Sequence, residues 1–81
     1  MHELSLALSL IEVVEQEAAA RGGLRVRAVR LRVGALAGVS TEALAFAYEV
    51  ACEGTGLAGS RLVAEATPGR ELEVTGLEVE G

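Results

Sequence analysis

A helical period of apolar positions marks the first quarter of the chain. Over residues 4–20, apolar side chains recur at spacings of three and four, which is the repeat of an amphipathic helix. Gly22 and Gly23 follow Arg21, and glycine readily adopts the left-handed conformation that closes a last turn. We therefore predict a helix over 4–20. Its expected buried stripe comprises Leu4, Ala7, Leu8, Ile11, Val14 and Ala18, widened by Leu6, Leu10 and Val13.

The pattern changes to an alternation of apolar residues and arginines over residues 24–33. A period of two predicts a β-strand, and we expect Val29, Leu31 and Val33 on its buried face. Two apolar residues adjoin at Ala28–Val29, so either the strand starts near Val29 or a bulge lies there.

A loop with two glycines, residues 34–39, precedes a second helical pattern. Ser40 is a good N-cap, and Glu42 suits the positive end of a helix dipole. Gly54 is predicted to end this helix. The expected buried stripe consists of Leu44, Ala47 and Ala51 together with Ala43, Phe46 and Val50.

Two further alternating segments, 61–67 and 71–81, predict strands that are separated by Pro68–Gly69. In the second segment, Leu72 and Val74 share one face. The connection between the segments is only two or three residues long, so a hairpin is the expected arrangement.

The predicted order is α-β-α-β-β, which indicates a single α+β domain over residues 1–81 with two layers. The helix-containing link between the first two strands is long enough for a parallel crossover. A mixed three-stranded sheet follows, with both helices on one face and water on the other. Arginines suit the wet face, where we expect Arg30 and Arg32 to pair with Glu71 and Glu73.

The composition excludes several kinds of chemistry. The chain has one His, one Cys and one Met, and it contains neither Lys nor Asp. A zinc site of four Cys and His ligands cannot form within one such chain, and a Ser-His-Asp triad lacks its aspartate. Cys52 has no second cysteine for a disulfide, and we interpret it as a structural residue near the end of the second helix.

Charge and hydropathy limit the possible partners and the possible cellular compartment. A net charge of −5 argues against a nucleic-acid partner. The apolar N-terminal segment lacks a basic region and is interrupted by glutamates, so we expect neither a signal peptide nor a membrane span. A single cysteine fits a reducing, cytoplasmic setting.

The residues best suited to metal chemistry lie at the start of the chain, Met1-His2-Glu3. The α-amine of Met1, the amide nitrogen of His2 and the His2 imidazole can close fused chelate rings around one ion. Nitrogen donors in a near-planar array favour Ni(II) or Cu(II), and Glu3 adds a carboxylate. That carboxylate is needed because the positive end of a helix dipole disfavours a bound cation. On chemistry alone, a frayed polar N-terminus is the alternative interpretation.

Three segments of the chain resemble the hydrogenase/urease nickel-incorporation proteins of the HypA/HybF type. They are the start MHELSLA, the internal run VRLRVGALAGVSTEALAFAYEVACEGT and the final RELEVTGLEVEG, and they follow the family's order from one end of the chain to the other. The resemblance implies a nickel metallochaperone, and not an enzyme, that holds Ni(II) through Met1, His2 and Glu3. It also implies two partners, a maturation GTPase and a hydrogenase precursor.

The chain departs from that family at two places. The family inserts a zinc-binding domain with two C-x-x-C-type pairs between its second and third strands, whereas this chain has Pro68-Gly69-Arg70 there. We therefore expect the zinc domain to be absent at about residues 68–70 and no zinc to be bound. Members often carry a carboxylate at the position of Ser40, and in some it contributes to nickel binding. Serine is a poorer nickel ligand.

A second hypothesis is a protein-interaction or structural module that binds no metal. Such a module would use the surface of the first helix or the sheet edges, for a maturation partner or for self-association. Exposed edges and a short hinge between the second and third strands are compatible with a homodimer formed by strand exchange. A stability that ignores nickel would favour this hypothesis, because a ligand bound to the native state raises stability.

Overall fold

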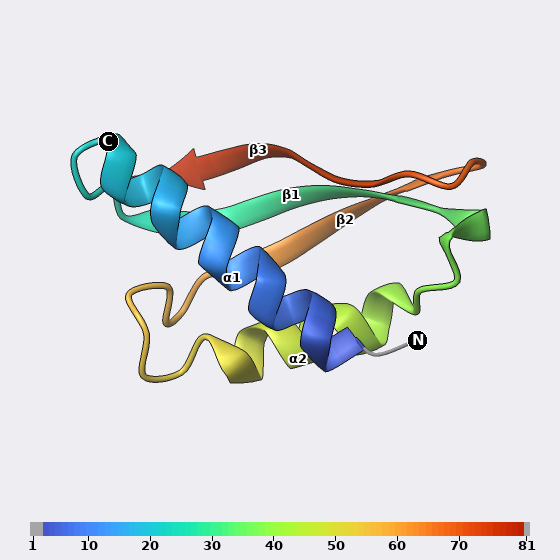
Figure 1. Ribbon diagram of the computed structural model, residues 1–81, viewed down its shortest axis with the longest axis horizontal. Helices are drawn as coiled ribbons and strands as arrows, with labels where there is room; N and C mark the ends of the chain where they lie inside the picture. The colour runs from blue at the N-terminus through green and yellow to red at the C-terminus, as the bar shows by residue number, and fades with distance from the viewer. Residues whose placement is uncertain (1–2, 81) are drawn as a thin grey trace.

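Two helices pack on one face of a three-stranded sheet (Figure 1). The computed structural model describes residues 3–80. Within them the expected α-β-α-β-β order and the two-layer α+β architecture are confirmed. The elements are α1 (Glu3–Ala20), β1 (Val26–Gly34), a short 3-10 helix η1 (Ala35–Ala37), α2 (Thr41–Ala51), β2 (Arg61–Thr67) and β3 (Leu72–Val79).

The buried face of α1 is confirmed at its centre and wrong on one flank. Four predicted positions are buried, but Leu4 and Leu8 are 57% and 53% exposed. Leu6 and Leu10, on the opposite flank of the stripe, pack against the core instead. That flank faces β3 across an open groove, where Leu6 and Leu10 are half-buried and Val13, also predicted to be in the stripe, is 55% exposed. The buried positions are Ala7, Ile11, Val14 and Ala18.

The strand order corrects one prediction. β1 is the central strand, with β2 parallel to it on one side and β3 antiparallel on the other. The parallel crossover through α2 is confirmed, but the hairpin between β2 and β3 is wrong because β1 lies between them. Two strand spacings of about 4.8 Å separate β2 from β3. The residues 68–71 are long enough to step over the end of β1, so a short link did not require a hairpin.

The step over β1 depends on Gly34, the last residue of that strand. The Gly34 N–H donates to the Glu71 carbonyl at 2.6 Å, and the Leu36 N–H donates to the Gly69 carbonyl at 2.8 Å. A Cβ at Gly34 would overlap the backbone of Gly69. The linking residues therefore lie directly against the end of β1, at the tip of the sheet beyond the helices in Figure 1.

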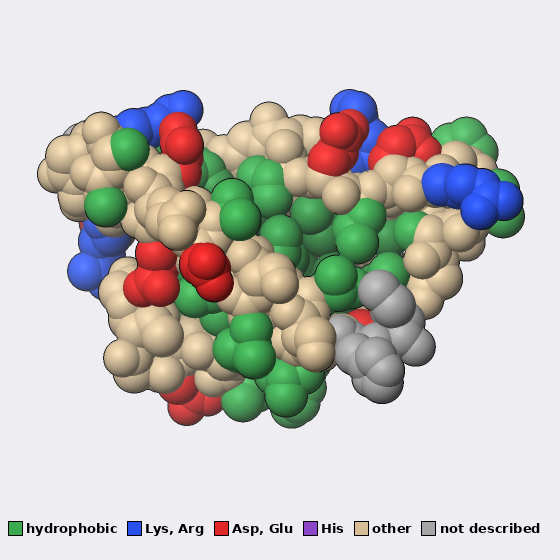
Figure 2. All heavy atoms as spheres, viewed as in Figure 1, with side chains coloured by type: hydrophobic (Ala, Val, Ile, Leu, Met, Phe, Trp, Pro, Cys, Tyr) green, Lys and Arg blue, Asp and Glu red, His purple; other side chains and the backbone are tan. Residues whose placement is uncertain are grey.

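The core lies between β1 and the two helices. Val29, Leu31 and Val33 are buried as predicted. Leu72 and Val74 pair with Val33 and Leu31, so they share that face as predicted, yet each remains 37% exposed. Figure 2 shows the reason: apolar side chains stay visible between α1 and β3, in a groove lined by Leu6, Leu10, Val13, Leu44, Leu72 and Val74.

The buried face of α2 differs from the predicted stripe. Leu44 and Tyr48 are fully buried, whereas Phe46 is 72% exposed and Val50 is 48% exposed. Residues two apart lie about 200° apart around a helix, so Phe46 must face away once its neighbours Leu44 and Tyr48 face the core. Burying the tyrosine requires a partner for its hydroxyl, and Ser60 supplies one. The helix ends at Ala51, slightly before the turn that contains Gly54.

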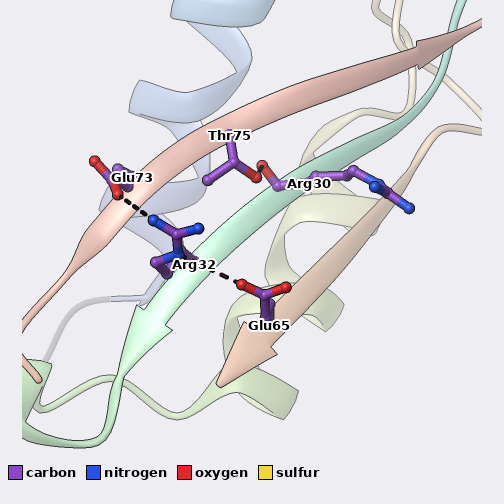
Figure 3. A network of polar contacts seen from close by, with 5 residues as sticks. All are labelled: Arg30, Arg32, Glu65, Glu73 and Thr75. Atoms are coloured by element: carbon purple, nitrogen blue, oxygen red, sulfur yellow. Dashed lines mark hydrogen bonds and ion pairs between the residues drawn. The ribbon is translucent and has the colours of Figure 1, made fainter. Parts of the chain in front are cut away.

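The outer face of the sheet carries the arginines, as predicted. Arg32 forms ion pairs with Glu73 at 3.1 Å and with Glu65 at 3.4 Å, so it bridges β3 and β2 across β1 (Figure 3). Arg30 pairs with Glu78 at 3.2 Å rather than with the expected Glu71. Gly76 lies opposite Arg30 and Glu78 lies opposite the nearby Ala28, whereas Glu71 lies beside Gly34 at the far end of β1. All these side chains are exposed, so each pair contributes little to stability.

Candidate metal centre

The described part of the predicted metal site is Glu3, the first residue of α1. Met1 and His2 lie outside the described residues. Within residues 3–80 no group of three or more His, Cys, Asp or Glu side chains is arranged to hold a metal ion. The metal site at Met1, His2 and Glu3 therefore stays a prediction, and Glu3 is the part of it that the structure describes.

Glu3 lies against the start of α2. Its carboxylate accepts a hydrogen bond from the Ser40 backbone N–H at 3.3 Å, across 37 positions of sequence. Figure 1 shows the first turns of α1 and α2 at the same end of the molecule. The fold thus brings together two positions singled out from the sequence, Glu3 and Ser40.

Ser40 is the N-cap of α2, as predicted. Its side-chain oxygen accepts a hydrogen bond from the Ala43 N–H at 3.2 Å. In a capping box, a Glu or Gln at the position of Ala43 would reach back to the N-cap N–H. Alanine cannot do so, and Glu3 takes that place from a different helix. The carboxylate therefore has a structural role at α2 in addition to any role toward a metal.

The electrostatics of this end are set by two helix N-termini. Each carries backbone N–H groups that have no partner within the helix and a partial positive charge, which repels a cation and attracts a carboxylate. Glu3 and Glu42 place negative charge in the first turns of α1 and α2, respectively. These carboxylates offset the helix dipoles, as the sequence argument requires of Glu3.

A second polar cluster lies at the other end of α2, and it is buried. The Tyr48 and Ser60 hydroxyls lie 2.8 Å apart, and the Ser60 hydroxyl donates to the Leu57 carbonyl at 2.7 Å. The Cys52 sulfur lies 3.7 Å from the Ser60 oxygen and is inaccessible to solvent. Burial raises the pKa of the Tyr48 hydroxyl well above its usual range. The structural interpretation of Cys52 agrees with this setting.

Sequence reasoning missed both Tyr48 and Ser60. The signal for Tyr48 was present, because Leu44, Tyr48 and Cys52 recur every four residues along one helix face. Nothing in the sequence pattern marks Ser60 as its partner, since Ser60 precedes a strand and looks like an ordinary loop residue. No other cysteine is available to Cys52, and its thiol is enclosed, so this cluster offers no metal site.

The fold and these donors define a small α+β domain whose candidate metal centre lies at the start of the chain. A family described as hydrogenase/urease nickel incorporation, metallochaperone, hypA matches residues 1–79. The chain therefore belongs to the HypA family. Members of this family are hydrogenase maturation factors and nickel metallochaperones, and the resemblance stated from the sequence is confirmed.

Individual relatives are similar over most of this chain but are longer. The hydrogenase maturation factor HypA of Streptomyces avermitilis is 54% identical over 71 residues, which are 86% of this chain and 54% of the relative. That of Chloroflexus aurantiacus is 48% identical over 68 residues, which are 84% of this chain and 60% of the relative. That of Nitrosospira multiformis is 44% identical over 81 residues, covering 99% of this chain and 70% of the relative.

The chain spans little more than half the length of the first two of these relatives. The similarity therefore describes a part of those proteins.

No helix within residues 3–80 has the length and apolar character that crossing a bilayer demands.

Proposed function

We propose that this chain is a nickel-binding metallochaperone module that collects Ni(II) for the maturation of a hydrogenase. The ion is held by the Met1 amine, the His2 amide nitrogen and the His2 imidazole, with Glu3 or water completing the site. The observation that carries the proposal is the family match over residues 1–79, which includes the Met1-His2-Glu3 start. The chelate geometry of those donors supplies its chemistry.

The Glu3–Ser40 hydrogen bond supports a site that is partly organised before the ion arrives. Because α1 begins at Glu3 and its carboxylate is bonded to the α2 N-cap, the chain just before Glu3 starts from a fixed point. Glu3 itself then need not be ordered when the ion binds. Glu3 acts first as a positioning residue and second as a source of negative charge.

A carrier must also release its ion. A site with few protein donors suits an ion that is passed on rather than retained. We propose that the recipient is a hydrogenase precursor and that a maturation GTPase assists the transfer. The role is that of a carrier without catalysis, and a lone thiol suits the cytoplasm as its compartment.

We also propose that the link 68–71 is where longer members of the family carry additional residues, including the zinc-binding domain. The link lies at the tip of the sheet, away from both helices, and its ends are already held by β2 and β3. An insertion there would leave the strand pairing of the domain intact. Without that insertion this chain has one cysteine, so zinc is not expected to be bound.

Isothermal calorimetry with Ni(II) tests the nickel assignment on the chain with its native start and no tag. One ion per chain is expected, and His2→Ala is expected to abolish this stoichiometric binding. Adding a tag before Met1 should also weaken binding, because the free amine is lost. Ser9→Ala, on the α1 surface away from the site, is the matched control. An unchanged affinity in His2→Ala would remove the site assignment.

A further inference from the structure

The two edges of the sheet differ in what they offer to another strand. Within residues 3–80, β2 and β3 both flank β1, so each has one side without a strand neighbour. On β3, the charged side chains of the outer face are Glu73 and Glu78, and a register irregularity interrupts the strand between them. β3 carries no positive charge, so a second β3 placed alongside offers these glutamates no ion pair.

The β2 edge carries a self-complementary pattern instead. Arg61, Val63 and Glu65 pair with Ala28, Arg30 and Arg32 of β1, so all three lie on the outer face. Two β2 strands that run antiparallel about a two-fold axis at Val63 place Arg61 of each copy opposite Glu65 of the other. Val63 then meets Val63 between two ion pairs. Val63 is 46% exposed in the single chain, so pairing would bury apolar surface at the centre of the contact.

Other registers lack this complementarity. Centring the axis on Arg61 sets arginine against arginine, and centring it on Glu65 sets glutamate against glutamate. Residues that face each other across an antiparallel pair must point to the same side, so the axis cannot be shifted by half a step. Centring on Leu62 or Ala64 leaves Arg61 opposite an uncharged residue. Only the Val63 register satisfies both charges within β2.

The side chains of the pattern are available for such pairing. Within residues 3–80, Arg61 has no carboxylate within 4.0 Å. Glu65 contacts Arg32 through Oε1 at 3.4 Å, and a carboxylate can accept further hydrogen bonds. Both side chains can therefore form the new pairs without first breaking a buried interaction.

Exposed apolar residues of α2 lie beside the same edge. Phe46 and Val50, the two large side chains that α2 turns away from the core, line a groove with Gly59, Ser60 and Arg61 at the start of β2. The apolar surface is thus continuous with the strand edge, and glutamates surround it. An apolar centre with a polar rim is the usual composition of a protein interface. A partner on the β2 edge would shield Phe46 from water.

From these observations we infer that two copies of this chain form a two-fold dimer by antiparallel pairing of their β2 strands, centred on Val63. The product is one six-stranded sheet with Arg61–Glu65 pairs on both sides of the axis. No segment is exchanged between copies. The metal centres, at the α1 and α2 N-termini, stay outside the pairing, so the dimer does not depend on nickel.

Sedimentation equilibrium of the full chain in chelator-treated buffer tests this interface by charge exchange. Arg61→Glu and Glu65→Arg each replace two attractive pairs with two repulsive ones, and each should raise the dimer dissociation constant about tenfold or more. The double variant R61E/E65R restores opposite charges and should return the constant close to that of the unaltered chain. Glu73→Arg is the matched control, since it also removes a partner of Arg32 but lies on β3.

Each outcome either supports or excludes the β2 interface. Weakening by both single variants with rescue by the double variant supports the β2 interface. A chain that is monomeric at every concentration overturns it. A dimer that ignores both charge reversals also overturns it, and points to another contact such as strand exchange through residues 68–71. Circular dichroism of every variant confirms that the exposed substitutions leave the fold unchanged.

Discussion

Each end of α2 is bonded to a serine, Ser40 as its N-cap and Ser60 from the loop before β2, yet the two ends have different uses. At the N-terminal end, Ser40 is exposed and meets the carboxylate of Glu3, which comes from another helix. At the C-terminal end, Ser60 is 2% exposed and is bonded to Tyr48 and to a backbone carbonyl. A buried polar group must be fully satisfied within the protein, whereas an exposed one can exchange partners.

The buried end of α2 therefore serves stability, and we expect the exposed end to serve binding. The buried end holds the loop 52–60 against the core and has no access for a ligand. The exposed end contributes less to stability, because its hydrogen bonds compete with water, but it contacts Glu3, a residue of the proposed nickel site. Disrupting the buried end should therefore unfold the protein more readily, while disrupting the exposed end should change nickel binding more than folding.

The largest effect is expected at the buried end. Tyr48→Ala removes a fully buried ring and leaves Ser60 without its hydroxyl partner, so it should lower the free energy of unfolding by about 3–5 kcal/mol. Urea denaturation followed by circular dichroism measures this loss. Phe46→Ala, which truncates an aromatic residue on the exposed face of the same helix, is the control and should change stability far less. Equal losses would contradict the assigned burial.

The buried tyrosine should also make stability depend on alkaline pH. Burial raises the pKa of Tyr48 in the folded state, so its neutral form is favoured there, and the unfolded chain loses its proton first. This contribution is complete below about pH 10, the usual pKa of tyrosine, and is lost as the pH rises above it. Tyr48→Phe should remove this dependence. The chain has a single tyrosine, so persistence of the same alkaline loss in Tyr48→Phe would exclude it as the cause.

A smaller effect is expected at the exposed end. Ser40→Ala removes the N-cap of α2 and should cost about 1 kcal/mol of stability. Ser40→Asp keeps a capping oxygen and adds a carboxylate beside the metal centre, so it should retain stability and tighten Ni(II) binding. Thermal unfolding and calorimetry on the same pair of variants separate these effects. A Ser40→Asp chain with weaker nickel binding would show that this loop does not face the ion.

Local patterns predicted both helices and all three strands because each depends on neighbours a few residues apart. The strand order could not be predicted in the same way, since a four-residue link fits a hairpin as well as a step over one strand. Gly34 was the available clue, because only glycine lets the link lie against the end of β1. Phe46 was predicted to be buried, whereas the helix turns Tyr48 to the core instead. Tyr48 can be buried because Ser60, twelve residues away, bonds its hydroxyl, and the local pattern does not show this partner.

The candidate site likewise has one part that the sequence predicted and one part that it did not. The Met1-His2-Glu3 donors were recognised from residue types alone, and their assignment to nickel stays a prediction. Glu3 and Ser40 are 37 positions apart in the sequence. Their contact could therefore be recognised only from the packing of α1 beside α2. A capping role for Glu3 was likewise hidden, because the sequence offers no glutamate at the position of Ala43.

A two-dimensional ¹H–¹⁵N NMR titration of the untagged chain with Ni(II) tests the central claim most directly. The backbone signals of Glu3, Ser40 and Ala43 should shift or broaden first and saturate at one ion per chain. Those of Tyr48, Cys52 and Ser60, at the other end of α2, should stay unchanged. Perturbations that begin at Cys52 or on the outer face of the sheet, with Glu3 and Ser40 unaffected, would contradict a nickel site at the start of the chain.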